Sequence, residues 1–342
     1  MNKKLIALAV AGACTVPAAM AQTANPVTLY GRAYVTLEQV EAKGGAGTPS
    51  RTRIEDQSSL FGIRGTEDLG GGLRAFFQLE TAFRLDQNNT TFAARNSGVG
   101  LQGGFGSVLL GRWDMPFKVA TIAIDPYGDL TLSGITGTLS DGGNFDRREQ
   151  NVLQYWSPTM GGFAFRLAGT ANEGKTTAVN PRTYGANVTF TRGPVYVFGA
   201  WEKHKDQVGS TATAERDEEG WAIGGSLVFG PVKVGVQHQQ IEKTTRSDIE
   251  NWMGNVVFTF GKNQIMLQHM RSEGGQVSGA EPDCESNSIG YQYNFTRRTF
   301  FIGSYIRVKN EDGATCNFGA NRLTIGANQD PQGVFIGLRH VF

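Results

Sequence analysis

Arg32, Arg64 and Arg74, near the start of the chain, each stand in a short segment in which polar and apolar residues alternate. A long segment further on carries Asp125 and Asp129. Guanidinium and carboxylate groups that face each other across a water-filled passage create a transverse field, which orients water and polar solutes. The chemistry that these residues indicate is electrostatic, and it requires the arginines and the aspartates to lie on opposing surfaces.

Arg112 joins this candidate set, although it stands at the start of the long segment, where the alternation ends. Catalysis is not indicated by the histidines, because none of them has an acid–nucleophile pair beside it. The four are His204, His238, His269 and His340. A G-x-G-x-x-G match begins at Gly98, but it leads into a turn and another strand, whereas a dinucleotide site must lead into a helix. We therefore expect no enzyme, and no spaced ligand set calls for a metal or other cofactor.

The segments that must position these groups have a period of two, which is typical of β-strands. In the clearest of them, residues 73–83, Leu, Ala and Phe alternate with Arg, Gln and Glu. We count roughly sixteen such segments of about 10 residues, the length that a tilted strand needs to cross a bilayer. The pattern predicts an all-β fold, an antiparallel transmembrane barrel of about sixteen strands over residues 22–342.

Turn lengths support the same architecture, since short turns alternate with long polar loops, as in membrane barrels. Gly70–Gly72 is typical of the short turns, and residues 41–56 are expected to form one of the long loops. A large soluble sandwich or propeller is the alternative. It is disfavoured because sixteen strands in one sheet enclose a lumen too wide for side chains to fill, so the polar faces must point into it.

One connection differs from the rest. Residues 114–148 are rich in Ile, Leu, Phe and Tyr, whereas the other long loops are polar. A long apolar loop must pack against something, and long loops without secondary structure are usually functional. We expect this loop to fold into the barrel.

The first 21 residues have the form of a signal peptide, with Lys3 and Lys4, an apolar run and an Ala19-Met20-Ala21 cleavage site. Its loss would leave the chain close to neutral, since the whole sequence has 32 Lys and Arg against 31 Asp and Glu. No basic stripe indicates nucleic-acid binding. Cys284 and Cys316 would remain in an oxidising compartment, and we expect them to pair, although sequence alone leaves two free thiols open.

Several stretches resemble the Gram-negative general porins of the neisserial and Burkholderia type. They are VTLYGR at 27–32, GIRGTEDLGGGLRAFFQLE at 62–80, LLGRWDMPF at 109–117 and GLRHVF at 337–342. The resemblance implies a barrel in the Gram-negative outer membrane, usually a homotrimer, which lets small hydrophilic solutes and ions diffuse passively. It implies that the third external loop forms the constriction. It also implies lipid and lipopolysaccharide as surroundings, and Phe342 as a sorting signal for the barrel-insertion machinery; an interfacial anchor is the simpler role for Phe342.

The chain departs from the family at two positions. Leu60 follows Ser59 where the family commonly has arginine, and Asn96 stands where another lumen arginine is common. Arg95 beside it is expected to face outward unless a bulge shifts the register. Weak or mixed ion selectivity is therefore expected. A substrate-specific channel is the main alternative, because aromatic residues face inward by parity, although they are scattered: Tyr34, Phe76, Tyr196, Phe198, Phe301 and Tyr305. A surface adhesin or receptor barrel is the other.

Overall fold

The computed structural model describes residues 27–44, 47–88, 90–128, 131–139, 144–206, 217–244, 247–275 and 282–342. The expected signal peptide, residues 1–21, lies outside the described residues, and so does Asp129. Within the described ranges, no helix is long and apolar enough to cross a membrane.

Antiparallel strands form one closed sheet with sixteen barrel strands, two of which are interrupted. The strands before the long connection are β1 (Thr28–Lys43), β2 (Thr48–Asp56), β3 (Leu60–Gly70), β4 (Leu73–Phe83), β5 (Thr90–Thr91), β6 (Ser97–Gly103) and β7 (Gly106–Asp114). Those that follow are β8 (Arg148–Trp156), β9 (Phe163–Thr170), β10 (Arg182–Arg192), β11 (Val195–Lys205), β12 (Glu218–Phe229), β13 (Val232–Lys243), β14 (Ile249–Phe260), β15 (Asn263–Gly274), β16 (Asp283–Asn294), β17 (Thr299–Glu311) and β18 (Asp330–Val341).

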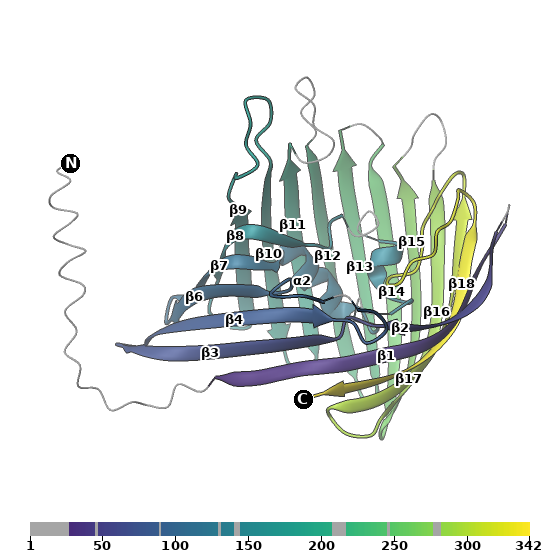
Figure 1. Ribbon diagram of the computed structural model, residues 1–342, viewed down its shortest axis with the longest axis horizontal. Helices are drawn as coiled ribbons and strands as arrows, with labels where there is room; N and C mark the ends of the chain where they lie inside the picture. The colour runs from purple at the N-terminus through teal and green to yellow at the C-terminus, as the bar shows by residue number, and fades with distance from the viewer. Residues whose placement is uncertain are drawn as a thin grey trace.

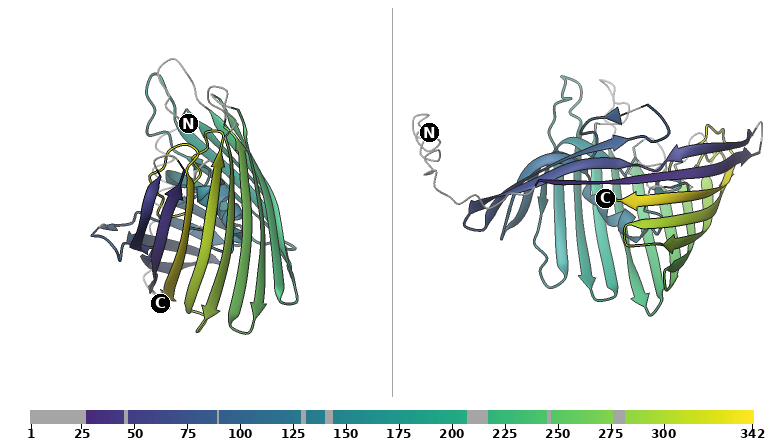
Figure 2. Two further views of the ribbon diagram at one scale, coloured as in Figure 1. Left: turned by 90° about the vertical axis from the view of Figure 1, so that its right-hand side faces the viewer. Right: turned by 60° about the horizontal axis from the view of Figure 1, so that its bottom comes forward.

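The ring closes because β18 pairs with β1 in a continuous antiparallel ladder that runs from Arg32 opposite Val341 to Lys43 opposite Asp330. In Figure 1, β1, β3 and β4 of the near wall run across β11 to β15 of the far wall, as expected of a closed barrel with tilted strands. The views in Figure 2 place the purple first strand beside the yellow last one. The fold predicted from the two-residue period is confirmed.

Two barrel strands are interrupted near their upper ends. β2 and β3 pair in succession with β1, and β5 and β6 pair in succession with β4. Between β2 and β3 the chain turns at Ser58, which has a φ of 59°. The sequence predicted a long loop over residues 41–56, and this prediction is wrong: the described part of the segment is the end of β1 and β2, which pair as a hairpin. Its backbone groups are satisfied by the β1–β2 ladder, and an ion pair of 2.8 Å joins Arg53 to Glu38 across it.

Turns and longer connections lie at opposite ends of the barrel. The β3–β4 turn is typical of the short ones, because Gly70, Gly71 and Gly72 all have positive φ, which glycine adopts without strain. The longer connections join β7 to β8, β9 to β10, β11 to β12, β15 to β16 and β17 to β18. The β7–β8 connection contains the short helices α2 (Pro116–Thr121), η1 (Ile122–Ile124) and η2 (Ile135–Gly137).

The apolar core lies inside the barrel, between this connection and the inner wall. Phe117, Ile124 and Phe145 are completely buried, and they pack with Phe198 and Met270 of the wall. Many apolar side chains on the outer face are exposed instead. This arrangement suits a barrel that is surrounded by lipid and holds a folded segment inside.

One strand of the wall behind this segment, β17, has an apolar inner face. Ile302, Ile306 and Val308 of β17 point inward and are buried in the core, whereas Tyr305 is 40% exposed on the outer face. The predicted inward direction of Tyr305 is wrong. Phe300, and not its neighbour Phe301, packs inside against Tyr34. The assumption that the polar face of every strand lines the lumen fails on β17, where the loop and Tyr34 cover the wall.

Candidate functional site

The candidate site is built on the β7–β8 connection, which we call the inward loop (residues 115–147). β7 ends at Asp114 and β8 begins at Arg148, so this loop is the segment that stood out in the sequence. In Figure 1 its helix α2 lies inside the barrel, against the far wall. The described parts of the loop follow the inner wall from β10 round to β18.

Hydrogen bonds fasten the loop to this wall at several levels. The Asn187 side chain of β10 donates to the Pro116 carbonyl at 2.6 Å. The Asn255 side chain of β14 donates to the Ile124 carbonyl at 3.0 Å. Further along, Tyr127 lies against Gly290 of β16, where a Cβ would stand 2.7 Å from the tyrosine hydroxyl. Polar wall residues thus satisfy loop backbone groups that would otherwise be buried without partners.

Asp125 does not face the arginines as the sequence predicted. Its side chain accepts a hydrogen bond from the amide of Tyr127 at 2.9 Å, one from the amide of Ile135 at 3.2 Å and one from Gln268 of β15 at 3.2 Å. The residue is only 8% exposed. Its carboxylate therefore stabilises the turn of the loop and its attachment to the wall. Asp129, the other predicted aspartate, lies outside the described residues.

The wall residues that pack with the described loop residues lie on β10 to β18 and, near Val40, on β1. The other sector of the wall runs from the start of β1 through β3 to β8, and we call it the uncovered wall. Arg32, Arg64 and Arg74 occur in this sector on strands that share one inward face, since Arg32 stands opposite Leu60 in the β1–β3 ladder and Arg64 opposite Gln78 in the β3–β4 ladder. Among the described residues, none of the three arginines forms an ion pair. The Arg32 Nε donates to the Ser58 carbonyl at 2.9 Å, and one of its terminal nitrogens is buried without a hydrogen-bond partner.

Arg95 is a site residue that the strand parity missed. It was expected to face outward, but its Nε lies 2.7 Å from the Glu80 carboxylate, and it interacts electrostatically with Arg32. The chain between β5 and β6 leaves the ladder, and the amide of Arg95 bonds to the Glu80 carbonyl. This break shifts the register, so that Arg95 takes the inward direction. The ladder with β4 resumes at Gly98 of β6, which pairs with Gln78.

Arg148, Arg166 and Arg339 extend the basic sector. Arg148 pairs with Asp114 at 2.9 Å at the two ends of the inward loop. Arg339 of β18 stands opposite Tyr34 in the ladder and interacts electrostatically with Arg32. None of the three was among the site residues predicted from the sequence, although Arg166 and Arg339 stand on the inward face of their strands, opposite Asn187 and Tyr34. We call Arg32, Arg95, Arg148 and Arg339 the arginine cluster.

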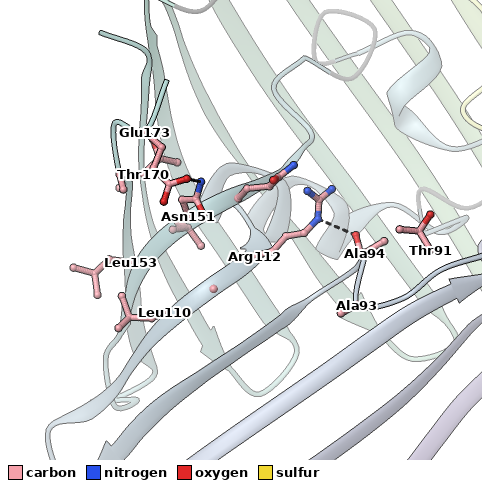
Figure 3. Close-up of a pocket in the computed structure, with 14 residues that line it drawn as sticks. Thr91, Ala93, Ala94, Leu110, Arg112, Asn151, Leu153, Thr170 and Glu173 are labelled. Carbon is pink, nitrogen blue, oxygen red and sulfur yellow. Dashed lines mark hydrogen bonds between the residues drawn. The ribbon is translucent and has the colours of Figure 1, made fainter. Parts of the chain in front are cut away.

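Arg112 lies outside the arginine cluster. Its Nε donates to the Ala94 carbonyl at 2.8 Å, and it lines a cavity of about 1010 Å³ with Leu110 and Leu153 (Figure 3). Those two leucines are more than half exposed, on the face opposite the buried Leu109, so the cavity opens on the outer face of the wall. Arg112 lies on the same face of β7 as the exposed Leu110 and not on that of the buried Leu109, which does not favour its predicted place in the constriction.

A disulfide links Cys284 at the start of β16 to Cys316 in the β17–β18 connection, with 6.2 Å between their Cα atoms. The segment that follows Cys316 hydrogen-bonds to the inward loop: the amide of Asn317 donates to Gly137 and that of Gly319 donates to Leu132. The disulfide therefore fixes the β17–β18 connection to β16, and this connection in turn holds the middle of the inward loop.

The chain is similar to known proteins over most of its length. A family model described as Gram-negative porin matches residues 7–313 of the chain. The chain belongs to the Gram-negative porins. It is 31% identical to outer membrane porin protein 32 of Delftia acidovorans, with both chains covered completely. It is 26% identical to the major outer membrane protein P.IB of Neisseria gonorrhoeae, with 87% of this chain and 91% of that one covered.

Solved structures agree with the family. An anion-selective porin from Comamonas acidovorans has a TM-score of 0.82 at 27% identity, covering 93% of this chain and all of that one. OmpT of Vibrio cholerae, described as a trimer form, has a TM-score of 0.72 at 18% identity, which shows the shared fold alone. This porin is therefore an outer-membrane channel for small hydrophilic solutes and not an enzyme. His204, one of the four histidines considered above, is completely buried. Its ring is hydrogen-bonded to Glu202 at 2.7 Å and stacks on the ring of Phe145.

Proposed function

We propose that this porin conducts small ions with a modest preference for anions, and that residues 114–148 form its constriction. The observation that carries the proposal is the charge of the uncovered wall. The arginine cluster, together with Arg64, Arg74 and Arg166, outnumbers the carboxylates beside it, which are Asp56, Glu80 and Asp114. Fixed positive charge that borders a narrow aqueous passage lowers the energy of anions there and raises that of cations.

This proposal revises the weak or mixed selectivity expected from the sequence. That expectation rested on the missing arginines at Leu60 and Asn96. Arg95, the chain neighbour of Asn96, supplies an inward guanidinium that pairs with Glu80, and the Asp125 carboxylate accepts a hydrogen bond from Gln268 of the wall. The similarity to an anion-selective porin supports the same sign of selectivity.

The proposed test is the zero-current potential of the refolded porin in a planar bilayer across a tenfold gradient of KCl. A potential of the sign set by chloride permeation would support the proposal. A potential of the sign set by potassium would overturn the anion preference. Insertion into the bilayer without conductance would overturn the open passage itself.

The outer cavity beside Arg112 supports assembly with a second copy of the chain, and a homotrimer is the assembly proposed. The cavity is lined in part by polar groups, among them Gln150 and Asn151, which a neighbouring protein would satisfy better than lipid tails would. Cross-linking of the unheated protein in detergent should yield a largest product of three chains. A largest product of one chain would contradict the trimer. Contacts with lipopolysaccharide and with the insertion machinery belong to the same proposal, with Phe342 as the sorting signal.

A further inference from the structure

A cavity of about 290 Å³ lies on the inner wall, below the start of the inward loop and on the side of the short turns. Its lining comes from β1, β3, β4, β6, β7 and β8, and it includes Arg64, Phe76, Gln78, Gln102, Trp113 and Trp156. This volume stands at the lower end of the range, about 300 to 1,000 Å³, that holds small organic ligands in proteins.

Three aromatic rings from three different strands meet at this cavity. The ring of Trp156 stacks on that of Phe76, with centroids 6.3 Å apart and planes 30° apart, and it contacts that of Trp113 at 5.3 Å. None of the three is buried in the core behind the loop. Aromatic faces on the wall of an aqueous passage offer a solute a surface for stacking that a purely polar wall lacks.

One guanidinium group lies over these rings and another lines the cavity. Arg166 lies over the Trp156 ring, with 5.1 Å from its guanidinium carbon to the centroid, and Arg64 lies over the Tyr30 ring at 5.0 Å. Among the described residues, neither arginine has a carboxylate within 4.0 Å. Their charge is therefore available to an anion, and their planar groups match a carboxylate with two parallel hydrogen bonds.

We propose that this cavity is a weak binding site for small aromatic carboxylates in the path of the pore. The ring of the solute would stack on Trp156 and Phe76, while its carboxylate would bond to Arg64. The inference rests on the proposed anion preference, since the solute must first pass as an anion. Binding near the millimolar range would suit a channel, because a site on a conduction path must also release its solute.

The test is the block of KCl current through the refolded porin by sodium benzoate at neutral pH. Acetate carries the same charge without the ring, and benzyl alcohol carries the ring without the charge. Benzoate should reduce the conductance at concentrations where neither control does. A reduction by acetate equal to that by benzoate would contradict the ring contact, and a reduction by benzyl alcohol equal to that by benzoate would contradict the role of the arginines.

Substitutions at Trp156 and Phe76 test whether benzoate blocks the current at this cavity. Trp156→Leu and Phe76→Leu should each raise the half-blocking benzoate concentration by up to about tenfold, the range for loss of one aromatic pair. Trp252→Leu changes a tryptophan that is 52% exposed on the outer face, and it should leave the block unchanged. Because Trp156 also donates to Gln154, the Phe76 variant keeps the test valid if the tryptophan variant folds poorly. An unchanged half-block in Phe76→Leu would overturn the site.

The two proposals fail separately. A chloride-selective zero-current potential without any block by benzoate would overturn the aromatic site and leave the anion preference standing. A potassium-selective potential would overturn the anion preference, and benzoate block in that case would have to be lost in Phe76→Leu to be assigned to this cavity.

Discussion

Gly31 and Phe342 exchange two backbone hydrogen bonds, 3.1 Å from the Gly31 amide to the Phe342 carbonyl and 3.0 Å from the Phe342 amide to the Gly31 carbonyl. A Cβ on Gly31 would lie 2.5 Å from the phenylalanine ring, so the ring packs directly over the glycine backbone. The last residue of the chain thus completes the closure of the barrel beside its first strand.

This contact allows the two roles of Phe342 to be separated. If the residue is a sorting signal, Phe342→Ser should strongly reduce the amount of assembled porin in the outer membrane, while refolding of the purified variant in detergent should stay close to normal. Phe342→Tyr, which keeps the ring over Gly31, is the matched control and should assemble normally. Equal loss in cells and in detergent would show that the ring is only a structural anchor.

The position of the inward loop is open to a similar test at Gly290. Gly290→Val places a branched side chain where the Tyr127 hydroxyl would stand 2.7 Å from its Cβ. Overpacking of this kind costs about 1–3 kcal/mol and should displace the loop toward the open sector. Single-channel recordings should show lower conductance or frequent partial closures.

Gly303→Val is the control for this change. Gly303 lies on β17, and its nearest neighbour would be a methyl carbon of Ile336 at 3.6 Å, which is ordinary contact. Its conductance should equal that of the parent. Parent-like, quiet recordings from Gly290→Val would show that the loop at Tyr127 does not border the passage.

The Cys284–Cys316 disulfide should stabilise the fold through the external connection that it closes. Cys316→Ser should lower the free energy of unfolding by about 2–4 kcal/mol, the usual value for a native disulfide. Urea unfolding in detergent, followed by tryptophan fluorescence, measures the change. A reductant should shift the parent's midpoint toward that of the variant and leave the variant unaffected. An unchanged midpoint in the reduced parent would contradict this role.

The architecture of the barrel was predictable because its strands repeat one physical rule many times. Most strands alternate apolar and polar residues, and the short turns carry glycine. An error in one strand or turn therefore hardly changes the predicted number of strands. The β1–β2 hairpin was not predicted because β2 is polar on both faces, with Arg51 and Arg53 on one and Thr52 on the other. Without an apolar face, its sequence does not differ from that of a polar loop.

The site was less predictable, since it depends on single side-chain directions near interruptions of the ladder. Arg95 turns inward because the chain leaves the ladder between β5 and β6. Arg112 shares the face of the exposed Leu110, but it stands where the strand passes into the loop, so its direction was not assigned from the sequence. Asp125 is used inside the loop, where its partners Tyr127 and Ile135 are close in sequence. Alternation assigns a direction only where the register is unbroken.

The most direct test of the proposed constriction uses the ion pair of Arg95 and Glu80. Arg95→Gln and Glu80→Gln change the charge of the same pair in opposite directions. A unit charge about 5 Å from a passing ion changes the energy of that ion by about 0.8 kcal/mol in water, a factor of about four. Arg271→Gln removes an arginine from the outer face, where it pairs with Asp283, and serves as the control.

The measurement is the zero-current potential of each variant in a KCl gradient at low salt, where charges are least screened. We predict that Arg95→Gln lowers the chloride-to-potassium permeability ratio by about two- to fourfold, that Glu80→Gln raises it by a similar factor, and that Arg271→Gln leaves it unchanged. If the Arg95 and Glu80 variants keep the parent's ratio, or both move it in the same direction, this part of the wall does not border the ion path.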